Sequence, residues 1–185
     1  MTSPSDEGAS QVLERTLRTS PVTGIRVDSV LTAVLISEFL DPSPELWLVS
    51  AWISDVPAVD NSGGDFDSLI IDASARVYQL SEILGLLTRQ GTHLIVVTRN
   101  VPENGSFQAR LDRAVEDRRL HVIYGADAHE KTFCGRDWLL SGSMNFTVNG
   151  MAANDEAVTY RLDRAAAAEA RLDLKHRWGT HEPGR

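Results

Sequence analysis

The stretch HEKTFCGRDWLLSGSMN (residues 129–145) holds the densest group of polar residues in this chain whose side chains could act in catalysis or in ligand binding. Its two halves, HEKTFC (129–134) and WLLSGS (138–143), are strand-like segments separated by a short Gly-Arg-Asp turn. Two such segments joined by a short turn predict a β-hairpin. A histidine, a lysine, a serine and an asparagine therefore gather where a sheet protein normally buries apolar side chains.

These polar side chains, with one further carboxylate, suit the chemistry of a phosphate group. In a strand, residues two positions apart share a face, so we expect His129 and Lys131 to point the same way. A neutral imidazole can act as nucleophile or proton carrier near neutral pH, and an ammonium beside it can stabilise charge on phosphate oxygens. Ser143 and Asn145 could donate hydrogen bonds to those oxygens, or simply satisfy backbone groups in a turn. Glu156 could accept from the second ring nitrogen of a histidine and so orient it.

The order HEK, GSMN and Glu156 resembles the signature of the phospholipase D superfamily, which is H-x-K, an aspartate, G-S-x-N and a downstream glutamate. The step of eleven residues from Asn145 to Glu156 is also similar to the family's spacing. The family has four residues between the lysine and the aspartate; here that position holds Arg136, with Asp137 one residue further on. We therefore expect Asp137, like Gly142, to give structural support.

The resemblance implies a covalent mechanism that uses neither a metal ion nor a cofactor. His129 would attack phosphorus to form a phosphohistidine, Lys131, Ser143 and Asn145 would bind the phosphate, and Glu156 would orient the histidine. A second histidine must protonate the leaving oxygen, yet the motif occurs only once in the chain. The resemblance thus implies a homodimer in which two copies of 129–156 face each other across a two-fold axis.

The rest of the chain alternates strands and helices. Three apolar runs predict buried strands, and they are separated by segments with helical periodicity. This order predicts an α/β fold whose mixed, largely parallel sheet is flanked by helices on both faces, with the active-site hairpin in the C-terminal half. The predicted strands are LWLVSAWI (46–53), HLIVVT (93–98), LHVIY (120–124) and EAVTYRL (156–162), and the predicted helices lie at 29–40, 80–87, 107–115 and 164–178.

Length and composition favour one soluble domain. The chain has 185 residues, one cysteine and 42% hydrophobic residues. We expect residues 1–20 to be disordered or to form a short helix, and 21–180 to form a single phospholipase D-like catalytic domain. No apolar run is long enough to span a membrane, and MTSPSDEGAS at the start lacks a secretory pattern. These features predict a cytoplasmic protein that does not act on membranes.

The expected function is that of a DNA nuclease, an endonuclease-type phosphodiesterase. The formal net charge of −8 argues mildly against broad nucleic-acid binding, but a site for one phosphate needs only a local positive cluster. GSMNFTVNGMAANDEAV and VSAWISDVPAVDN further resemble phospholipase D-like proteins of bacterial DNA-modification and anti-phage clusters. Two alternatives stay open: a phospholipase or other phosphodiesterase, and a subunit of a defence complex that binds DNA or a partner without cleaving alone.

Three other residues need an interpretation. Cys134 has the opposite strand parity from His129, which favours a packing role. His121 lies within LHVIY and is expected to be a core histidine. Trp52, near the end of a predicted strand, is expected in the core or lining the site.

Overall fold

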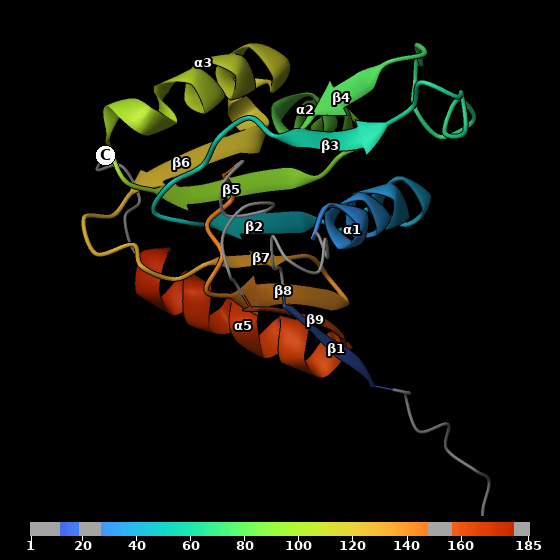
Figure 1. Ribbon diagram of the computed structural model, residues 1–185. Coiled ribbons are helices and arrows are strands. Elements are labelled where there is room, and N and C mark those ends of the chain that lie inside the picture. Colours follow the sequence, from blue (N-terminus) through green and yellow to red (C-terminus); the bar gives the residue numbers. More distant parts are fainter. Residues whose placement is uncertain (1–11, 19–26, 148–156, 180–185) are drawn as a thin grey trace, which may run out of the picture.

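A seven-stranded mixed sheet forms the centre of the computed structural model, which describes residues 12–18, 27–147 and 157–179 (Figure 1). The strand order is β1-β9-β8-β7-β2-β5-β6. The strands are β1 (Leu13–Arg18), β2 (Glu45–Val49), β5 (His93–Thr98), β6 (Leu120–Tyr124), β7 (Thr132–Cys134), β8 (Trp138–Gly142) and β9 (Ala157–Leu162).

The sheet has a parallel part and an antiparallel part. β2, β5 and β6 are parallel neighbours, and they are the three apolar runs of the sequence. β7 then pairs with β2 in the antiparallel sense, and β8, β9 and β1 follow in the same way. The predicted α/β class and mixed sheet are confirmed, with the parallel pairs confined to β2, β5 and β6. The predicted hairpin is formed by β7 and β8.

Helices cover both faces of the sheet, as predicted. Leu46 and Leu48 of β2 pack in the core that includes α1, α2 and α3, whereas Trp47 and Val49 pack with α5. Because neighbouring residues of a strand point to opposite faces, the two cores lie on opposite sides. Figure 1 shows α2 and α3 on one side of the sheet and α5 on the other. The helices are α1 (Asp28–Leu40), α2 (Leu80–Arg89), α3 (Gly105–Ala114) and α5 (Arg164–Trp178), and a small sheet of β3 (Pro57–Asp60) and β4 (Val77–Gln79) packs beside α1 and α2.

The N-terminal segment differs from the expectation of a short helix. Leu13–Arg18 is a strand that pairs along its whole length with β9. The side chains of this strand are largely exposed, so its hydrophobic pattern carries little information, and the free backbone groups of β9 decide its conformation. Residues 1–11 lie outside the described part of the chain, so the expectation of disorder there stays a prediction.

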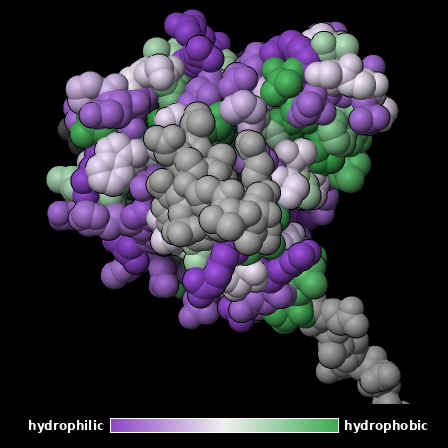
Figure 2. Space-filling model, in the orientation of Figure 1, coloured by the Kyte–Doolittle hydropathy of each residue, from purple (hydrophilic) through white to green (hydrophobic). Residues whose placement is uncertain are grey.

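Hydrophilic side chains predominate on the face seen in Figure 2, and the hydrophobic ones gather mainly toward the upper right of the view. Within the described ranges, no helix combines the length and the apolar composition needed to cross a bilayer.

Gly85 allows α2 and α3 to approach closely, and its replacement should destabilise the fold. A Cβ at Gly85 would lie 2.7 Å from the carbonyl oxygen and 2.8 Å from the Cβ of Ala114 in α3. Gly85→Ala must push the two helices apart, and we expect the free energy of unfolding to fall by about 1–3 kcal/mol. Urea denaturation measures this change.

Gly105→Ala is the matched control, since Gly105 is also helical but a Cβ there has no atom within 4 Å. We expect this variant to be neutral or more stable by up to about 1 kcal/mol, because alanine favours helix. Equal destabilisation by both substitutions would contradict the close packing of α2 on α3.

Candidate active site

The predicted site residues gather at one edge of the sheet because β7 runs against β2. Val49, the last residue of β2, pairs with Thr132, the first residue of β7. Residues just before Thr132 therefore lie beside the carboxyl ends of the parallel strands, where α/β sheets commonly bind ligands. The backbone N–H of Gly142, at the end of β8, donates to the carbonyl oxygen of Lys131 over 3.2 Å. The two halves of the motif thus meet at the same edge.

His129 and Lys131 lie in the segment that leads into β7. The imidazole of His129 is exposed and Lys131 is half-buried. The Lys131 ammonium donates to the carbonyl oxygen of His129 over 2.6 Å. Both residues precede the strand, which begins at Thr132. The expectation that residues two positions apart in a strand share a face therefore does not apply to them. The hydrogen bond from the Lys131 side chain to the His129 backbone links the pair instead.

Arg99, which the sequence analysis missed, lies against the imidazole of His129. Its Nη2 is 3.2 Å from Nδ1 and 3.0 Å from Nε2. Its Cζ is 5.0 Å from the centre of the Trp52 ring, within the range of a cation–π contact. Trp52 is 37% exposed. Of the two positions expected from the sequence, the core and the lining of the site, it therefore takes the second. Arg99 directly follows β5, and the tendency of ligand sites to form at strand carboxyl ends could have drawn attention to it.

Ser143 and Asn145 reach the same edge from β8. Ser143 exchanges hydrogen bonds with Ala157 of β9: its N–H donates to the Ala157 carbonyl oxygen over 3.0 Å, and its Oγ accepts from the Ala157 N–H over 3.1 Å. Asn145 Oδ1 lies 3.2 Å from the hydroxyl of Ser50, which follows β2. A Cβ at Gly142 would collide with the Ala157 carbonyl oxygen, so the glycine of the motif permits the close approach of β8 and β9.

Asn104, also missed, fixes the two loops that carry Trp52 and Arg99. Its side chain is fully buried. Nδ2 lies 3.0 Å from the carbonyl oxygen of Ala51 and 2.9 Å from that of Arg99, while Oδ1 accepts from the N–H of Ile53 over 2.9 Å. One amide group therefore holds the ends of β2 and β5 in a fixed relation. An isolated asparagine in a loop gives no local sequence pattern that would reveal this role.

The end of α5 fixes the loop that carries His129. Arg177 pairs with Glu130, the middle residue of HEK, over 2.6 Å. The Trp178 ring lies directly over Gly125, where a Cβ would collide with it. The loop from Gly125 to Glu130 is thus held at both ends by the last turn of this helix.

The other predicted residues lie elsewhere. Asp137 is in the β7–β8 turn, at the opposite end of the hairpin from His129, and it pairs with Arg136 over 3.0 Å. Glu156 lies outside the described residues, so its orienting role stays a prediction. His121 is exposed at the start of β6, with its side chain on the surface and not in the core.

Cys134 packs in the core and does not reach the site. Its side chain is fully buried in the cluster with Trp47 and Leu174. Burial raises the pKa of the Cys134 thiol to about 12.

The described residues contain no group of three or more histidine, cysteine or acidic side chains placed to hold a metal ion.

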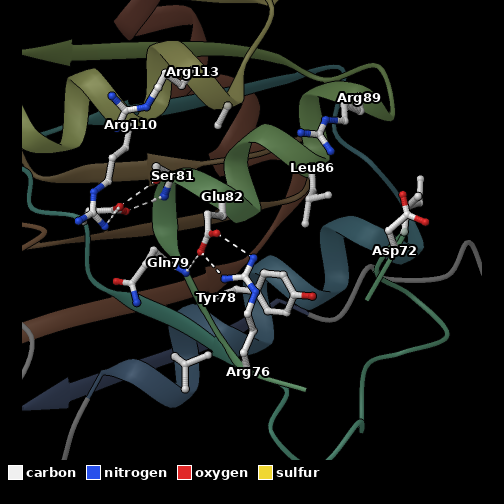
Figure 3. A pocket seen from close by; sticks show the side chains of 14 residues that line it. Asp72, Arg76, Tyr78, Gln79, Ser81, Glu82, Leu86, Arg89, Arg110 and Arg113 are labelled. Atoms are coloured by element: carbon white, nitrogen blue, oxygen red, sulfur yellow. Dashed lines mark hydrogen bonds and ion pairs between the residues drawn. The ribbon is translucent and has the colours of Figure 1, made fainter. Parts of the chain in front are cut away.

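A separate hollow of about 670 Å³ lies between β4, α2 and α3 and contains none of the predicted site residues (Figure 3). Arg76 and Glu82 pair across it over 2.8 Å, and Arg110 pairs with Asp55 over 3.2 Å. The hydrogen bond from Arg76 lowers the pKa of Glu82. The charges of these two pairs are thus matched within the protein.

Comparison with known proteins identifies the fold. No family model and no curated protein matches the chain. Among solved structures, NucT from Helicobacter pylori matches with a TM-score of 0.57 and 11% identity, over 90% of this chain and 95% of its own. The phospholipase D family member Nuc from Salmonella typhimurium matches with a TM-score of 0.56 and 12% identity, over 88% and 91%. Phosphatidylserine synthase from Haemophilus influenzae matches with a TM-score of 0.58 and 12% identity, over 91% of this chain and 39% of its own.

The chain therefore has the phospholipase D-like fold that its motif predicted. Two of these matches, NucT and the phospholipase D family member Nuc, extend over nearly the whole of both chains.

Cys134 should be unreactive in the folded protein. With a pKa of about 12, the fraction of thiolate at pH 8 is on the order of one in ten thousand. We expect alkylation by iodoacetamide, followed by mass spectrometry, to be at least about a hundredfold slower in the native protein than in urea. Equal rates in both states would contradict the buried position of this side chain.

Proposed function

We propose that the protein is a metal-independent phosphodiesterase, specifically a DNA nuclease that acts through a phosphohistidine at His129. The observation that carries this proposal is that HEK, which precedes β7, and GSMN, which begins at the end of β8, meet at one sheet edge. The likeness of the fold to NucT and to Nuc, a phospholipase D family member, supports the same reaction type.

The reaction requires one nucleophile and one acid. A neutral imidazole nitrogen of His129 attacks phosphorus, a P–N bond forms, and the P–O bond to the leaving group breaks. A second imidazolium gives its proton to the leaving oxygen and then accepts a proton from the water that attacks the phosphohistidine. His93 and His121 lie near the starts of β5 and β6, at the opposite sheet edge, and neither His176 nor His181 belongs to an H-x-K motif. The His129 of a second copy fills the role in a homodimer.

Positive and polar groups of the site stabilise the charge that develops on phosphate. The Lys131 ammonium can leave the His129 carbonyl oxygen and bind a non-bridging oxygen, to which it donates more strongly because that oxygen is charged. The Asn145 amide and the Ser143 hydroxyl lie at the same edge and can donate to the remaining oxygens. Glu156 orients an imidazole in this proposal.

Two other functions have some support. The match to a phosphatidylserine synthase favours a lipid phosphodiester as an alternative substrate. The net charge of −8 favours the second alternative, a subunit of an anti-phage or DNA-modification complex that needs partner subunits to cleave DNA. DNA remains our first choice because NucT and Nuc match over 88–95% of both chains, whereas the match to the synthase covers 39% of its chain.

His129→Ala should abolish metal-independent cleavage. We expect wild-type protein to cleave single- or double-stranded DNA in excess chelator, and His129→Ala to lose at least about a thousandfold in rate, because the nucleophile is gone. His121→Ala is the control, since this exposed histidine lies at the other sheet edge, and it should cleave as wild type does. Equal cleavage by wild type and His129→Ala would exclude His129 as the nucleophile.

The same assay separates the alternatives. Hydrolysis of bis(p-nitrophenyl) phosphate or phosphatidylcholine without cleavage of DNA would favour the other phosphodiesterases. DNA binding without cleavage, with affinity that falls steeply as salt is added, would favour the binding subunit.

A shared two-fold site predicts how mixtures of wild type and His129→Ala behave. Light scattering should give twice the 20.3 kDa mass of one chain. After subunit exchange, a heterodimer has one histidine where two are needed, so activity should fall with the square of the wild-type fraction. A linear fall would indicate that each chain works alone.

A further inference from the structure

We infer that Arg99, which stacks on the imidazole of His129 in the free protein, is drawn off it by the substrate phosphate, which it then binds. This inference rests on the proposed role of His129. It adds a second cation to the phosphate site.

Arg99 lies over the face of the His129 imidazole. Its Nη2 lies within 3.2 Å of both ring nitrogens. A guanidinium can only donate hydrogen bonds, and a neutral imidazole has a single accepting nitrogen, so at most one of these contacts is a hydrogen bond. An atom at nearly equal distance from both nitrogens lies over the ring and not in its plane, so the guanidinium stacks on the imidazole and makes no strong hydrogen bond with it.

The base of the Arg99 side chain is fixed while its head group is held weakly. The backbone carbonyl oxygen accepts from Asn104 Nδ2 over 2.9 Å and from the Val101 N–H over 3.0 Å. The head group has a neutral ring on each side, His129 and Trp52. In the described part of the chain no carboxylate pairs with Arg99, and its Nε is buried without a hydrogen-bond partner. Arg110 and Arg177, by contrast, each pair with a carboxylate.

A phosphate oxyanion is a better partner for this guanidinium than either ring. Charge-assisted hydrogen bonds are roughly twice as strong as neutral ones, and a guanidinium can bind two phosphate oxygens at once. A phosphate group that enters the site should therefore take Arg99 away from His129 and, at the same time, from the face of Trp52. Phosphate binding and the release of Arg99 from His129 then occur together.

Tryptophan fluorescence can follow this movement without any cleavage. We would titrate the full-length protein with inorganic phosphate and compare wild type, Arg99→Ala and Trp52→Phe. Arg118→Ala is the matched control, because the Arg118 side chain is 76% exposed and pairs with Glu116 outside the site. We expect a saturable change in wild type and Arg118→Ala. Arg99→Ala should bind phosphate at least about tenfold more weakly by calorimetry. Trp52→Phe should lose the fluorescence change but keep the binding.

Acylation of His129 tests its contact with Arg99 in a separate experiment. Without phosphate, diethylpyrocarbonate should modify His129 several-fold faster in Arg99→Ala than in wild type, with the exposed His121 as internal reference by peptide mass spectrometry. Arg99→Lys should restore part of the phosphate affinity, since the charge remains but the planar fork is lost.

Unchanged phosphate affinity and unchanged His129 acylation in Arg99→Ala would overturn the inference. Both measurements are independent of nuclease activity. A protein that binds phosphate through Arg99 but does not cleave DNA would contradict the proposed function and leave this inference standing.

Discussion

The antiparallel pairing of β7 with β2 is the constraint on which the rest of the site depends. At this pair the direction of the sheet reverses, so the carboxyl ends of β2, β5 and β8 meet the amino ends of β7 and β9. The segments that follow β2, β5 and β8 and the segment that precedes β7 then lie at one edge of the sheet. A slip of one residue between Val49 and Thr132 would turn every side chain of β7 to the opposite face, and it would separate His129 from Asn145.

The parallel half of the fold and the hairpin could be predicted from sequence because burial on both faces leaves continuous apolar runs. HLIVVT forms a largely buried strand, as its apolar run predicts, whereas LHVIY forms the edge strand β6, whose side chains are half-buried or exposed. The strand Leu13–Arg18 could not be predicted, since its side chains are largely exposed and its conformation depends on β9, about 140 residues later in the chain. The local sequence favoured disorder or a short helix there, whereas pairing with β9 makes the segment a strand.

The candidate site was predictable to the extent that it is a motif. The sequence itself shows the spacing of the motif residues His129, Lys131, Ser143 and Asn145. Arg99 belongs to no such spacing: its contact with His129 exists only because β5 and the segment before β7 end at the same sheet edge. Asn104 contributes to the site through hydrogen bonds with backbone groups, and Trp52 through the contact of its ring with Arg99. No sequence pattern indicates either contact.

The last turn of α5 has a consequence for the order in which the protein is made. A ribosome releases the hairpin and its histidine well before residues 177 and 178, yet Arg177 and Trp178 hold the loop in which that histidine stands. A nascent chain interrupted before α5 would contain every residue of the motif without the helix that fixes their loop. The loop that carries the histidine can therefore reach the position seen in the structure only after Trp178 has been made.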